Sequence, residues 1–544
     1  MKASAVTTAD CHPFAVAPGL SRLFGDFCAG DAELRRWYGF SPFDPGWKQA
    51  PARPTHWVAL AGALAGQNPA EAGSARAAAL DALRAGAGVT VTGQQVGLFG
   101  GPLFTPLKAA TAVARARQAT ESGSPHVAIF WLASEDHDFA EINHVTFPAR
   151  RELRKLTYAH APAATVPVGG VVLDATIGPL IDEAWELLGA SEAMEALEAA
   201  YKPGRTFAPA FAEFYGRAFA AQGLLILDAS GREFHRMGAR VLRAGLEQAD
   251  ELHAALEERN RALVAAGYHA QVAVGTQSSL LFLMDAKTGA RVALKRTPKS
   301  AAEPDGLWQA GRERYATADL VGILESEPER ISPSALLRPV FQDELLGTSL
   351  TIGGPAEIAY FAQSAVLFER ILGRATPAEP RFSATLVEPA VAELLEKHGL
   401  DLARVFQENA DSLTQLIAAR TIPVEGKRKL AAAGKALDAE LEPLLDWMRG
   451  VDAGLGRAGE TAARKMRYQM NRLRRMSANF AMQKEESLKR HAEAITRSLY
   501  PGGVLQERLH GAAYYFARHG FDLAETLTRR AMEMACRGHA EIRL

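Results

Sequence analysis

Four ionisable residues follow one another directly after an uncharged, largely apolar run. In the stretch HVAIFWLASEDHDFAEINH, residues 126–144, these are Glu135, Asp136, His137 and Asp138. Ionisable side chains at the end of a buried strand are costly unless they pair with one another or bind a ligand. An imidazole whose tautomer is fixed by a carboxylate suits general acid–base catalysis. We therefore predict a catalytic or binding site here, with Asn143 as a further binding residue.

Two alternatives stay open for these acids. Asp136, Asp138 and Glu141 could bind a hard divalent cation such as Mg²⁺ through carboxylate oxygens, although we assign no metal ligand. The acids could instead cap a helix and pair with nearby arginines, which would make them structural.

A glycine-rich segment, VTVTGQQVGLFGGPLFTPLK, runs from a β-branched stretch into an alanine-rich helix. Backbone N–H groups at such a turn can bind an anion, so we predict binding roles for Gly93 and Gly97. Gln94 and Gln95 suit hydroxyl, amide or carboxylate groups, and Lys108 could reach back to a negative charge. The alternative is a tight turn with Lys108 in solvent. No G-x-x-x-x-G-K-[ST] sequence occurs, so a P-loop is excluded.

A third polar group lies in LLRPVFQDELLGTSLTIGGPAEIAYFAQ, residues 336–363, and includes a second glycine-rich turn. Its predicted binding residues are Arg338, Gln342, Asp343, Gly353, Gly354 and Glu357. Proline and glutamate in the first turn of a helix are also ordinary helix-start residues, so a structural role for Glu357 is equally favoured. The two glycine-rich turns would flank one crevice if their strands are neighbours.

Short apolar runs ending in Gly, Asp or Ser alternate with helical patterns over residues 90–384, which predicts an α/β fold with a buried parallel sheet. The expected strands are 89–93, 126–136, 223–230, 279–286 and 348–354, with a helix over 102–118. Residues 150–222 interrupt this rhythm and are interpreted as an insertion. Residues 294–335 are interpreted as a polar excursion, either a surface loop or a lid.

After residue 389 only helical patterns remain. Residues 427–450 and 460–500 predict an antiparallel hairpin, with the glycines of 451–460 forming its turn. Acids on the first arm, such as Asp438, would face bases on the second, such as Arg467. Six basic residues lie between Arg464 and Arg475, and they form either a solvated helix face or a phosphate-binding surface.

Composition excludes several classes of protein. The net charge of −1 over 544 residues gives no general attraction to nucleic acid or membranes. No apolar run approaches the ~18 residues that span a bilayer. The three cysteines, Cys11, Cys28 and Cys536, are far apart, which argues against a disulfide framework and favours the cytoplasm.

Four motifs occur in the order of a known family: VTGQQVGLFGGPLFTPLK, FWLASEDHDFAEINHV, LRPVFQDELLGTSLTIGGPAEIAYFAQ and LYPGGVLQER at 499–508. On these residues the chain resembles the bacillithiol biosynthesis cysteine-adding enzymes, a family of cysteine ligases, over nearly its whole length. It departs from the family pattern at Gly100 and Gly347, where threonine and proline are expected.

The resemblance implies a Rossmann-like core (1–385) with connecting-peptide insertions, related to class I aminoacyl-tRNA synthetases and nucleotidylyltransferases. It also implies a helical coiled coil (386–500) that forms a homodimer, and a C-terminal tail (501–544) packed on the core. The implied reaction joins the carboxyl group of cysteine to the amine of glucosaminyl-malate. ATP or ADP and Mg²⁺ are possible cosubstrates, and an ADP site associated with the helical domain is a family feature.

Within that reaction we expect the 93–102 loop to stabilise an oxyanion and Lys108 to neutralise negative charge. His137, oriented by Asp136 or Asp138, would accept the proton of the attacking amine, and Arg338 would hold the malate carboxylates. Two alternatives remain: a nucleotidyl- or acyl-transferase acting on another amino sugar, and a non-catalytic nucleotide-binding coiled-coil protein.

Overall fold

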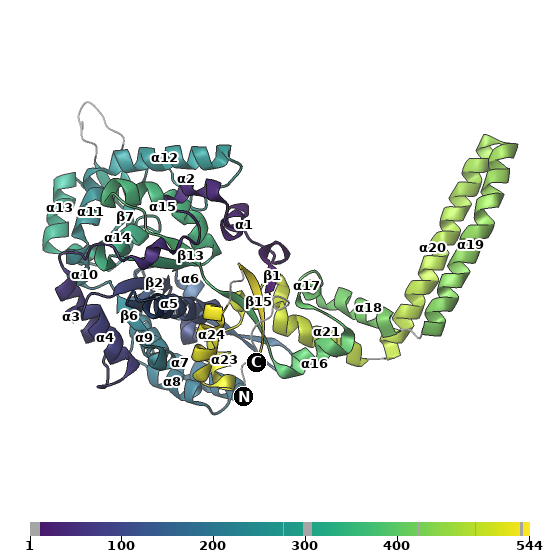
Figure 1. Cartoon of the computed structure of the whole chain (residues 1–544), viewed down its shortest axis with the longest axis horizontal. Coiled ribbons are helices and arrows are strands. Elements are labelled where there is room, and N and C mark those ends of the chain that lie inside the picture. Colours follow the sequence, from purple (N-terminus) through teal and green to yellow (C-terminus); the bar gives the residue numbers. More distant parts are fainter. Residues whose placement is uncertain (1–10, 276, 298–306, 422–423, 485, 534–536) are drawn as a thin grey trace. The chain divides into compact units, whose positions relative to one another are not determined.

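The computed structural model describes residues 11–275, 277–297, 307–421, 424–484, 486–533 and 537–544. The chain divides into two compact units. The first comprises residues 1–385 and 507–540, and the second comprises residues 386–506 and 541–544. Figure 1 shows the helices and strands of each unit.

A five-stranded parallel sheet forms the centre of the first unit. Its strands are β2 (Gly88–Gln94), β3 (His126–Leu132), β6 (Leu225–Asp228), β12 (Leu350–Gly353) and β13 (Ala378–Pro380). They lie in the order β13-β12-β2-β3-β6, and every pairing is parallel. The first strand in sequence is therefore central, as in a doubly wound Rossmann sheet. The predicted Rossmann-like α/β class is confirmed, whereas β13 was not predicted.

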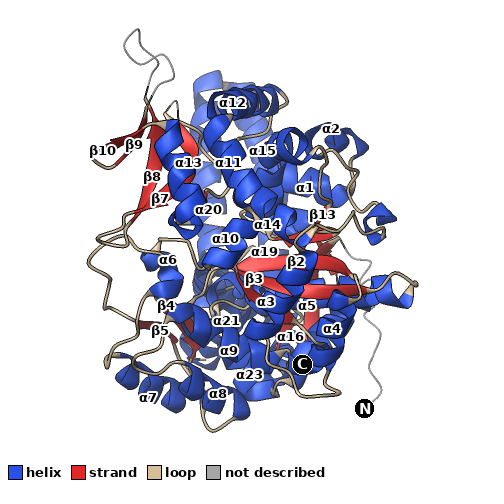
Figure 2. Cartoon of the chain, turned by 90° about the vertical axis from the view of Figure 1, so that its left-hand side faces the viewer, coloured by secondary structure: helices blue, strands red, loops and turns tan. Residues whose placement is uncertain are grey.

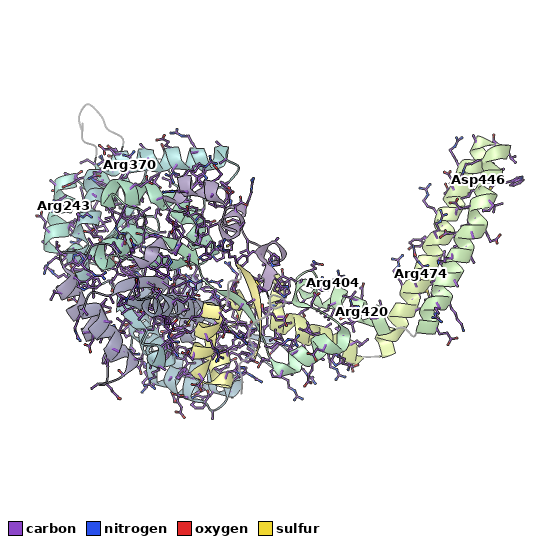
Figure 3. The ribbon with its side chains drawn as sticks, viewed as in Figure 1. Arg243, Arg370, Arg404, Arg420, Asp446 and Arg474 are labelled. Atoms are coloured by element: carbon purple, nitrogen blue, oxygen red, sulfur yellow. The ribbon has the colours of Figure 1, made fainter. Side chains whose placement is uncertain are left out.

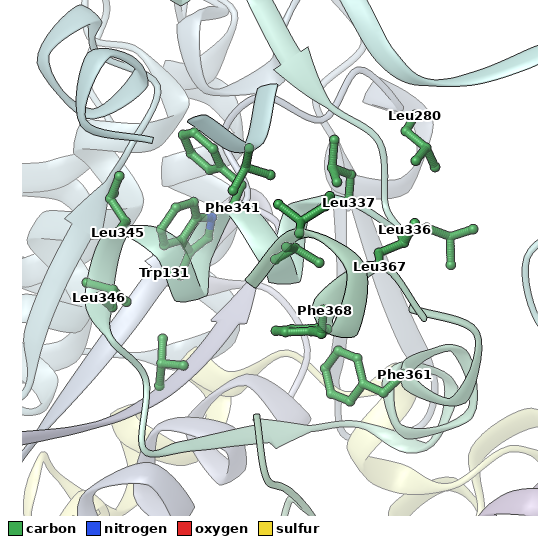
Figure 4. Close-up of a cluster of buried hydrophobic side chains, with 14 of the residues drawn as sticks. Trp131, Leu280, Leu336, Leu337, Phe341, Leu345, Leu346, Phe361, Leu367 and Phe368 are labelled. Carbon is green, nitrogen blue, oxygen red and sulfur yellow. The ribbon is translucent and has the colours of Figure 1, made fainter. Parts of the chain in front are cut away.

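Alternation along β3 explains how the sheet is covered on both faces, because successive side chains of a strand point to opposite sides. Phe130 stacks on Tyr215 of α9 (Phe207–Ala218), with ring centroids 5.7 Å apart. Trp131 contacts Phe341 of α14 (Arg338–Leu346) edge to face at 6.2 Å. Figure 2 shows helices around the red strands of this sheet, and Figure 4 shows Trp131 and Phe341 within the buried apolar cluster.

Two helices connect the strands that bound the candidate site. Helix α5 (Phe104–Glu121) follows β2, and α15 (Pro355–Leu372) follows β12. The chain steps from β2 to β3 in one direction and from β12 to β13 in the other. Right-handed crossovers therefore place α5 and α15 on opposite faces, and a crevice forms between the strand ends of β2 and β12.

A second, antiparallel sheet overturns two sequence predictions. Strand β7 (Ser278–Met284) does not join the parallel sheet, but pairs with β8 (Arg291–Arg296) and β11 (Ile331–Pro333). Strands β9 (Trp308–Ala310) and β10 (Glu313–Tyr315) extend this sheet, and α13 (Thr317–Ser326) precedes β11. The described part of 294–335 is therefore sheet and helix rather than a polar excursion. Trp308, on β9, is fully buried, and the burial of this large side chain favours regular structure over a surface loop here.

The remaining helices of the first unit surround these sheets. The N-terminal ones are α1 (Arg22–Ala29), α2 (Arg35–Tyr38), α3 (Trp57–Gln67) and α4 (Ala75–Arg84). The segment after β3 forms α6 (Phe139–Ile142), the hairpin β4 (His144–Pro148) and β5 (Leu153–Thr157), then α7 (Ile177–Leu188) and α8 (Glu192–Ala200). After β6 come α10 (Arg232–Met237), α11 (Ala239–Glu247) and α12 (Ala249–Ala265).

Residues 507–540, late in the chain, also belong to the first unit, and three helices and a strand lie wholly or partly within them. They include α22 (Gln506–Leu509), α23 (Ala512–His519) and α24 (Asp522–Glu533), which packs along α5. Strand β15 (Gly538–Arg543) pairs antiparallel with β1 (Cys11–Pro13) and also neighbours β14 (Ser383–Val387). Cys11 is disulfide-bonded, a bond that the sequence did not predict, whereas Cys28 is free and buried.

The second unit is helical, and it contains the predicted antiparallel hairpin. The hairpin is formed by α19 (Val424–Val451) and α20 (Ala453–Lys484). Its turn is shorter than predicted, because Asp452 accepts hydrogen bonds from the N–H groups of Gly454 and Leu455 and so starts α20 at once. Figure 3 shows Asp446 on α19 and Arg474 on α20.

Shorter helices complete the second unit: α16 (Pro389–His398), α17 (Leu402–Val405), α18 (Ala410–Thr421) and α21 (Glu486–Leu499). Of the expected charge pairs, Arg467 binds Asp438 at 2.8 Å. The predicted second arm, residues 460–500, divides between two helices, α20 and α21. Leu488, on α21, is buried, whereas Leu473 on α20 is 52% exposed. No helix in the described parts of the chain is long and apolar enough to span a membrane.

Candidate active site

A cavity of about 430 Å³ opens at the carboxyl ends of β2 and β12. It brings together the two glycine-rich turns and the acids that follow β3. Eight of the predicted site residues line it: Gly93, Gln94, Gln95, Lys108, Asp136, Arg338, Gly354 and Glu357. The other eight do not: Gly97, Glu135, His137, Asp138, Asn143, Gln342, Asp343 and Gly353. Parallel pairing of β2 with β12 explains why turns some 260 residues apart meet here.

Lys108 is buried, and all three N–H donors of its ammonium group have acceptors within the protein. It donates to the carbonyl oxygen of Gly93 at 2.8 Å, to Gln94 Oε1 at 3.0 Å and to the carboxylate of Glu357. Burial lowers the pKa of Lys108, and the adjacent Glu357 opposes that shift. Lys108 therefore ties the first turn to the second. Lys108 does not lie in solvent, which rules out that alternative, and the negative charge that it contacts in this structure is Glu357.

Glu357 links the two turns to the guanidinium group of Arg338. It accepts a 2.7 Å hydrogen bond from the N–H of Gly354, and its Oε1 lies 3.9 Å from Arg338. Burial alone would raise the pKa of Glu357, but Lys108 and Arg338 together lower it. The carboxylate is therefore ionised, and its contacts hold the two turns and Arg338 in place.

Arg338 keeps donors available to the cavity. It donates to the hydroxyl of Tyr360 at 2.9 Å and makes a long contact of 3.5 Å with Gln342. Burial raises the pKa of Tyr360 to about 12, although Arg338 by itself lowers it. The phenol is therefore protonated. Its oxygen accepts a hydrogen bond from one edge of the Arg338 guanidinium, and the other edge of the guanidinium can bind a carboxylate.

Gln95 brings two carboxylates together at the opposite wall. Its amide nitrogen lies 2.6 Å from Asp136 Oδ2 and 2.7 Å from Glu141 Oε2, and both acids line the cavity. An amide –NH₂ group has two donors, so one glutamine satisfies one oxygen of each acid. Oδ1 of Asp136 accepts the N–H of His137 at 2.7 Å and that of Asp138 at 3.3 Å. Among the described residues, Oε1 of Glu141 has no hydrogen-bond partner and is available to a cationic ligand.

His137 is held by an arginine that the sequence did not indicate. Arg291 Nη1 lies 3.0 Å from His137 Nδ1, whereas Asp136 Oδ1 lies 3.8 Å from it. A guanidinium can only donate, so Nδ1 accepts and the proton of the neutral ring sits on Nε2. Arg291 is itself fixed, because it donates to Ser332 Oγ and the carbonyl of Pro333 and stacks on Phe282. The predicted orientation of His137 by Asp136 or Asp138 is therefore wrong.

The other two acids of the 135–138 cluster have structural partners. Glu135 Oε1 lies 2.9 Å from Nε2 of the fully buried His235. Burial alone would lower the pKa of His235, but Glu135 raises it. Asp138 accepts a hydrogen bond from the N–H of Glu141 and caps α6. Within the described residues, no group of three or more acidic, histidine or cysteine side chains is placed to hold a metal ion.

The glycine-rich loop after β2 is anchored from behind by two tyrosines. Tyr201 donates to the carbonyl of Gly97 and accepts from the N–H of Gly100, both at 3.1 Å, and Tyr215 donates to the carbonyl of Gly100. Phe99 has a φ of 49°, a left-handed conformation unusual for a bulky residue. These bonds engage the carbonyl groups of Gly97 and Gly100 and the N–H of Gly100, so Gly97 shapes the turn and does not line the cavity.

Two further predicted binding residues act as supports. Asn143 donates to the carbonyl of Tyr158. Asp343 binds Arg374 at 2.6 Å and accepts from the N–H of Thr348. Burial raises the pKa of Asp343, and Arg374 opposes that rise.

Two arginines in the cavity wall, Arg381 and Arg508, were not predicted as site residues. Arg381 follows the short strand β13, whose three residues carry no periodic signal. Arg508 ends the late motif LYPGGVLQER, which could have drawn attention to it. Arg508 reaches the site because the chain returns to the first unit after the helical unit, and a local sequence pattern does not reveal that return.

Comparison with known proteins agrees with this architecture. The model of the N-terminal Rossmann-like domain of bacillithiol biosynthesis BshC matches residues 8–382, and that of the C-terminal coiled-coil domain matches 384–537. A protein of Koribacter versatilis named "Putative cysteine ligase BshC" is 40% identical over 98% of this chain and 99% of its own. Relatives with the same name from Solibacter usitatus and Geobacillus kaustophilus are 34% and 30% identical, covering 96% and 81% of this chain and 97% and 81% of their own.

One solved structure, titled as a putative arginyl-tRNA synthetase from Campylobacter jejuni, aligns with 84% of this chain and 97% of its own at 12% identity. Its TM-score of 0.22 is too low to support an argument, so the relationship to class I synthetases stays a prediction. The two domain models and the near full-length relatives instead confirm the resemblance first noted in the motifs. The chain belongs to the bacillithiol biosynthesis BshC family.

Proposed function

We propose that the protein is an amide-forming ligase that joins the carboxyl group of cysteine to the amine of glucosaminyl-malate. Family membership supports the reaction class, since relatives are named as cysteine ligases. One observation in the structure carries the proposal: a single cavity has carboxylates on one wall and arginines on another. Such a cavity suits a zwitterionic amino acid together with an acceptor that bears carboxylates.

The first substrate is proposed to bind by charge complementarity. The ammonium group of cysteine would lie against Glu141, which Gln95 holds in place. Its carboxylate would lie toward Arg338 and the N-terminus of α15, where Gly354, Pro355 and Ala356 line the cavity. A helix N-terminus and a guanidinium both favour a negative group, and both strengthen as charge develops on the reacting oxygen.

Amide formation from a carboxylate requires activation, for which ATP with Mg²⁺ is the proposed cosubstrate. A carboxylate oxygen of cysteine attacks a phosphorus of ATP, and pyrophosphate or ADP leaves as an acyl-adenylate or acyl-phosphate forms. The amine nitrogen then attacks the acyl carbon, the C–O bond to AMP or phosphate breaks, and the nitrogen loses a proton. Arg338, whose donors face the cavity, would stabilise the charge on the carbonyl oxygen.

The proton acceptor is proposed to be Asp136 rather than His137. Asp136 lines the cavity, and its Oδ2, which accepts from Gln95, keeps a second lone pair, whereas His137 lies outside the lining. With Nδ1 of His137 engaged by Arg291, its Nε2 bears the proton and cannot accept another. His137 would then act as a donor that supports the conformation of the acids beside it.

Mass spectrometry tests the reaction directly. Purified protein is mixed with cysteine, glucosaminyl-malate, ATP and Mg²⁺, and cysteinyl-glucosaminyl-malate is quantified with and without ATP. Asp136→Asn should abolish turnover, and Lys155→Met, at an exposed position on β5, is the control variant. Product from wild type only with ATP supports the proposal. Absence of product from folded protein, under both conditions, refutes it.

We also propose a homodimer through the helical hairpin. Large apolar side chains are exposed on both of its helices, including Trp447 at 63% and Met476 at 55%. A second copy of the same hairpin would cover them, because the exposed stripes are long and helical. Light scattering of the full chain should give the mass of a dimer, and Trp447→Ser should shift it toward the monomer. A wild-type monomer at micromolar concentration would refute the proposal.

A further inference from the structure

Arg381 is almost completely buried at the edge of the candidate site, with 5% of the residue exposed. Its two terminal nitrogens form a bidentate pair with Glu507, with distances of 3.0 and 2.6 Å. Its guanidinium carbon lies 5.5 Å from the ring centre of Phe104. The plane and direction of the side chain are therefore fixed from two sides.

Glu507 is committed entirely to this arrangement. Besides Arg381 it accepts from Ser383 Oγ, at 3.0 and 3.1 Å, and from the N–H of Ala384 at 3.0 Å. Burial alone would raise the pKa of Glu507, but Arg381 lowers it below the ordinary value. The carboxylate is thus ionised and points at Arg381 from a helix that lies more than 120 residues later in the chain.

The pair does not use the Nε–H donor of Arg381. This Nε–H has no hydrogen-bond partner among the described residues, whereas Nη1 and Nη2 both donate to protein oxygens. A Cβ at Gly354 would lie 3.8 Å from this nitrogen and 3.6 Å from Lys108 Cε. The missing side chain at Gly354 therefore leaves the space beside Nε open to the cavity. Desolvation makes a buried ion pair a poor source of stability, so its retention calls for another explanation.

Arg508 supplies a second guanidinium on the same wall. It is the next residue after Glu507 on α22, lines the cavity and is exposed to solvent. Within the described part of the chain it has no ion-pair partner. Two neighbouring residues of α22 thus have different roles: Glu507 fixes Arg381, and Arg508 lines the cavity. The acids of the site, Asp136 and Glu141, belong to the segment after β3.

We propose that Arg381 and Arg508 form an anion-binding subsite for the dicarboxylate end of the acceptor, with Glu507 as the positioning residue. This inference rests on the proposed function and adds to it the residues that select the acceptor. A carboxylate accepts the Nε–H of Arg381, and Arg508 closes on the same group or on its neighbour. A phosphate group has the same chemistry, so a nucleotide is the competing source of the anion.

Binding to the full chain tests the subsite without requiring turnover. Isothermal titration with L-malate, pyrophosphate and ADP compares wild type with Arg508→Ala and Arg381→Lys. Each variant should weaken malate binding about 10- to 100-fold, the range for one hydrogen bond to a charged group. Binding of ADP and pyrophosphate should be unchanged. Arg312→Ala removes an exposed arginine on the β9–β10 turn and should leave malate affinity unchanged.

Kinetics separates positioning from a merely structural role of Glu507. Glu507→Gln should raise KM for the acceptor about 10-fold, with little change in kcat or in KM for cysteine. A general structural defect would instead lower kcat and affect both substrates. If Glu507→Gln fails to fold, Arg508→Ala keeps the test open, because that side chain is exposed.

The outcomes are distinguishable from those of the ligase assay. Malate binding that depends on both arginines supports the subsite even if no amide product forms, in which case only the proposed reaction fails. Loss of pyrophosphate or ADP binding, with malate binding intact, would assign the arginines to the nucleotide and overturn the inference. Equal malate affinity in wild type and in both arginine variants would also overturn it.

Discussion

Replacing Lys108 by methionine tests whether this residue is the internal tie between the two glycine-rich turns. Methionine keeps the apolar stem but removes the ammonium group that serves Gly93, Gln94 and Glu357. Glu357 would then remain as a largely buried carboxylate, 20% exposed, with the N–H of Gly354 and Arg338, 3.9 Å away, as its partners. Removal of one member of a buried pair costs about 3–5 kcal/mol. Because Glu357 keeps these partners, we expect the lower end, about 3 kcal/mol.

The assay must report the first unit alone, since the chain has two units and a single global transition is not assured. Urea unfolding is therefore followed by pulsed hydrogen exchange and mass spectrometry of peptides from α5, residues 104–121. Lys108→Met should lower the free energy of unfolding by the stated amount, while Lys155→Met, the control on β5, should change it little. The double variant Lys108→Met, Glu357→Gln should recover stability, because neither charge is left unpaired.

Two results would refute this reasoning. A loss below about 1 kcal/mol for Lys108→Met would mean that the ion pair is exchanged for water, as at a surface. A double variant less stable than Lys108→Met would mean that the two residues are not coupled.

Three other predictions follow from the contacts of the site. Folding lowers the pKa of Glu357, so its contribution to stability is complete above the unfolded pKa near 4.5 and is lost as the pH falls through the pKa of the folded state. Glu357→Gln should therefore make the free energy of unfolding depend less on pH in the acid range. In ¹⁵N-histidine-labelled protein, solid-state NMR should find His137 with a bare Nδ1, and Arg291→Met should abolish that single tautomer; a wild-type Nδ1–H would contradict the assignment. Tyr201→Phe should lower the free energy of unfolding by about 1–3 kcal/mol, because it leaves the buried N–H of Gly100 unpaired, and an unchanged urea midpoint would contradict that role.

The sequence located the site to a useful degree because its turns have local signatures. Apolar runs that end in glycine or acid mark the carboxyl ends of parallel strands, where ligands bind in such sheets. This pattern predicts Gly93, Gly354 and Asp136 at strand ends, and all three line the cavity. The antiparallel hairpin was likewise predictable from its helical periodicity, apart from the length of its turn.

Local patterns misled where two sheets had to be told apart. The apolar run of β7 resembles a buried parallel strand, but its partners β8 and β11 are antiparallel. Periodicity alone does not reveal which strand a segment pairs with, since hydrogen-bond partners are chosen by packing across the chain. The same limitation hid Arg291, which lies on β8 and contacts His137 more than 150 residues away.

By itself, the sequence determined the class of fold, the family, and the strand ends at which a ligand would bind, because these depend on local spacing and turn residues. Only the tertiary structure decided which side chains are free to act. The three donors of Lys108 are engaged by three acceptors, and Arg381 is oriented by Glu507 from another part of the chain. The physical reason is that a donor or acceptor has a fixed capacity, and what uses that capacity is settled by residues brought together on folding.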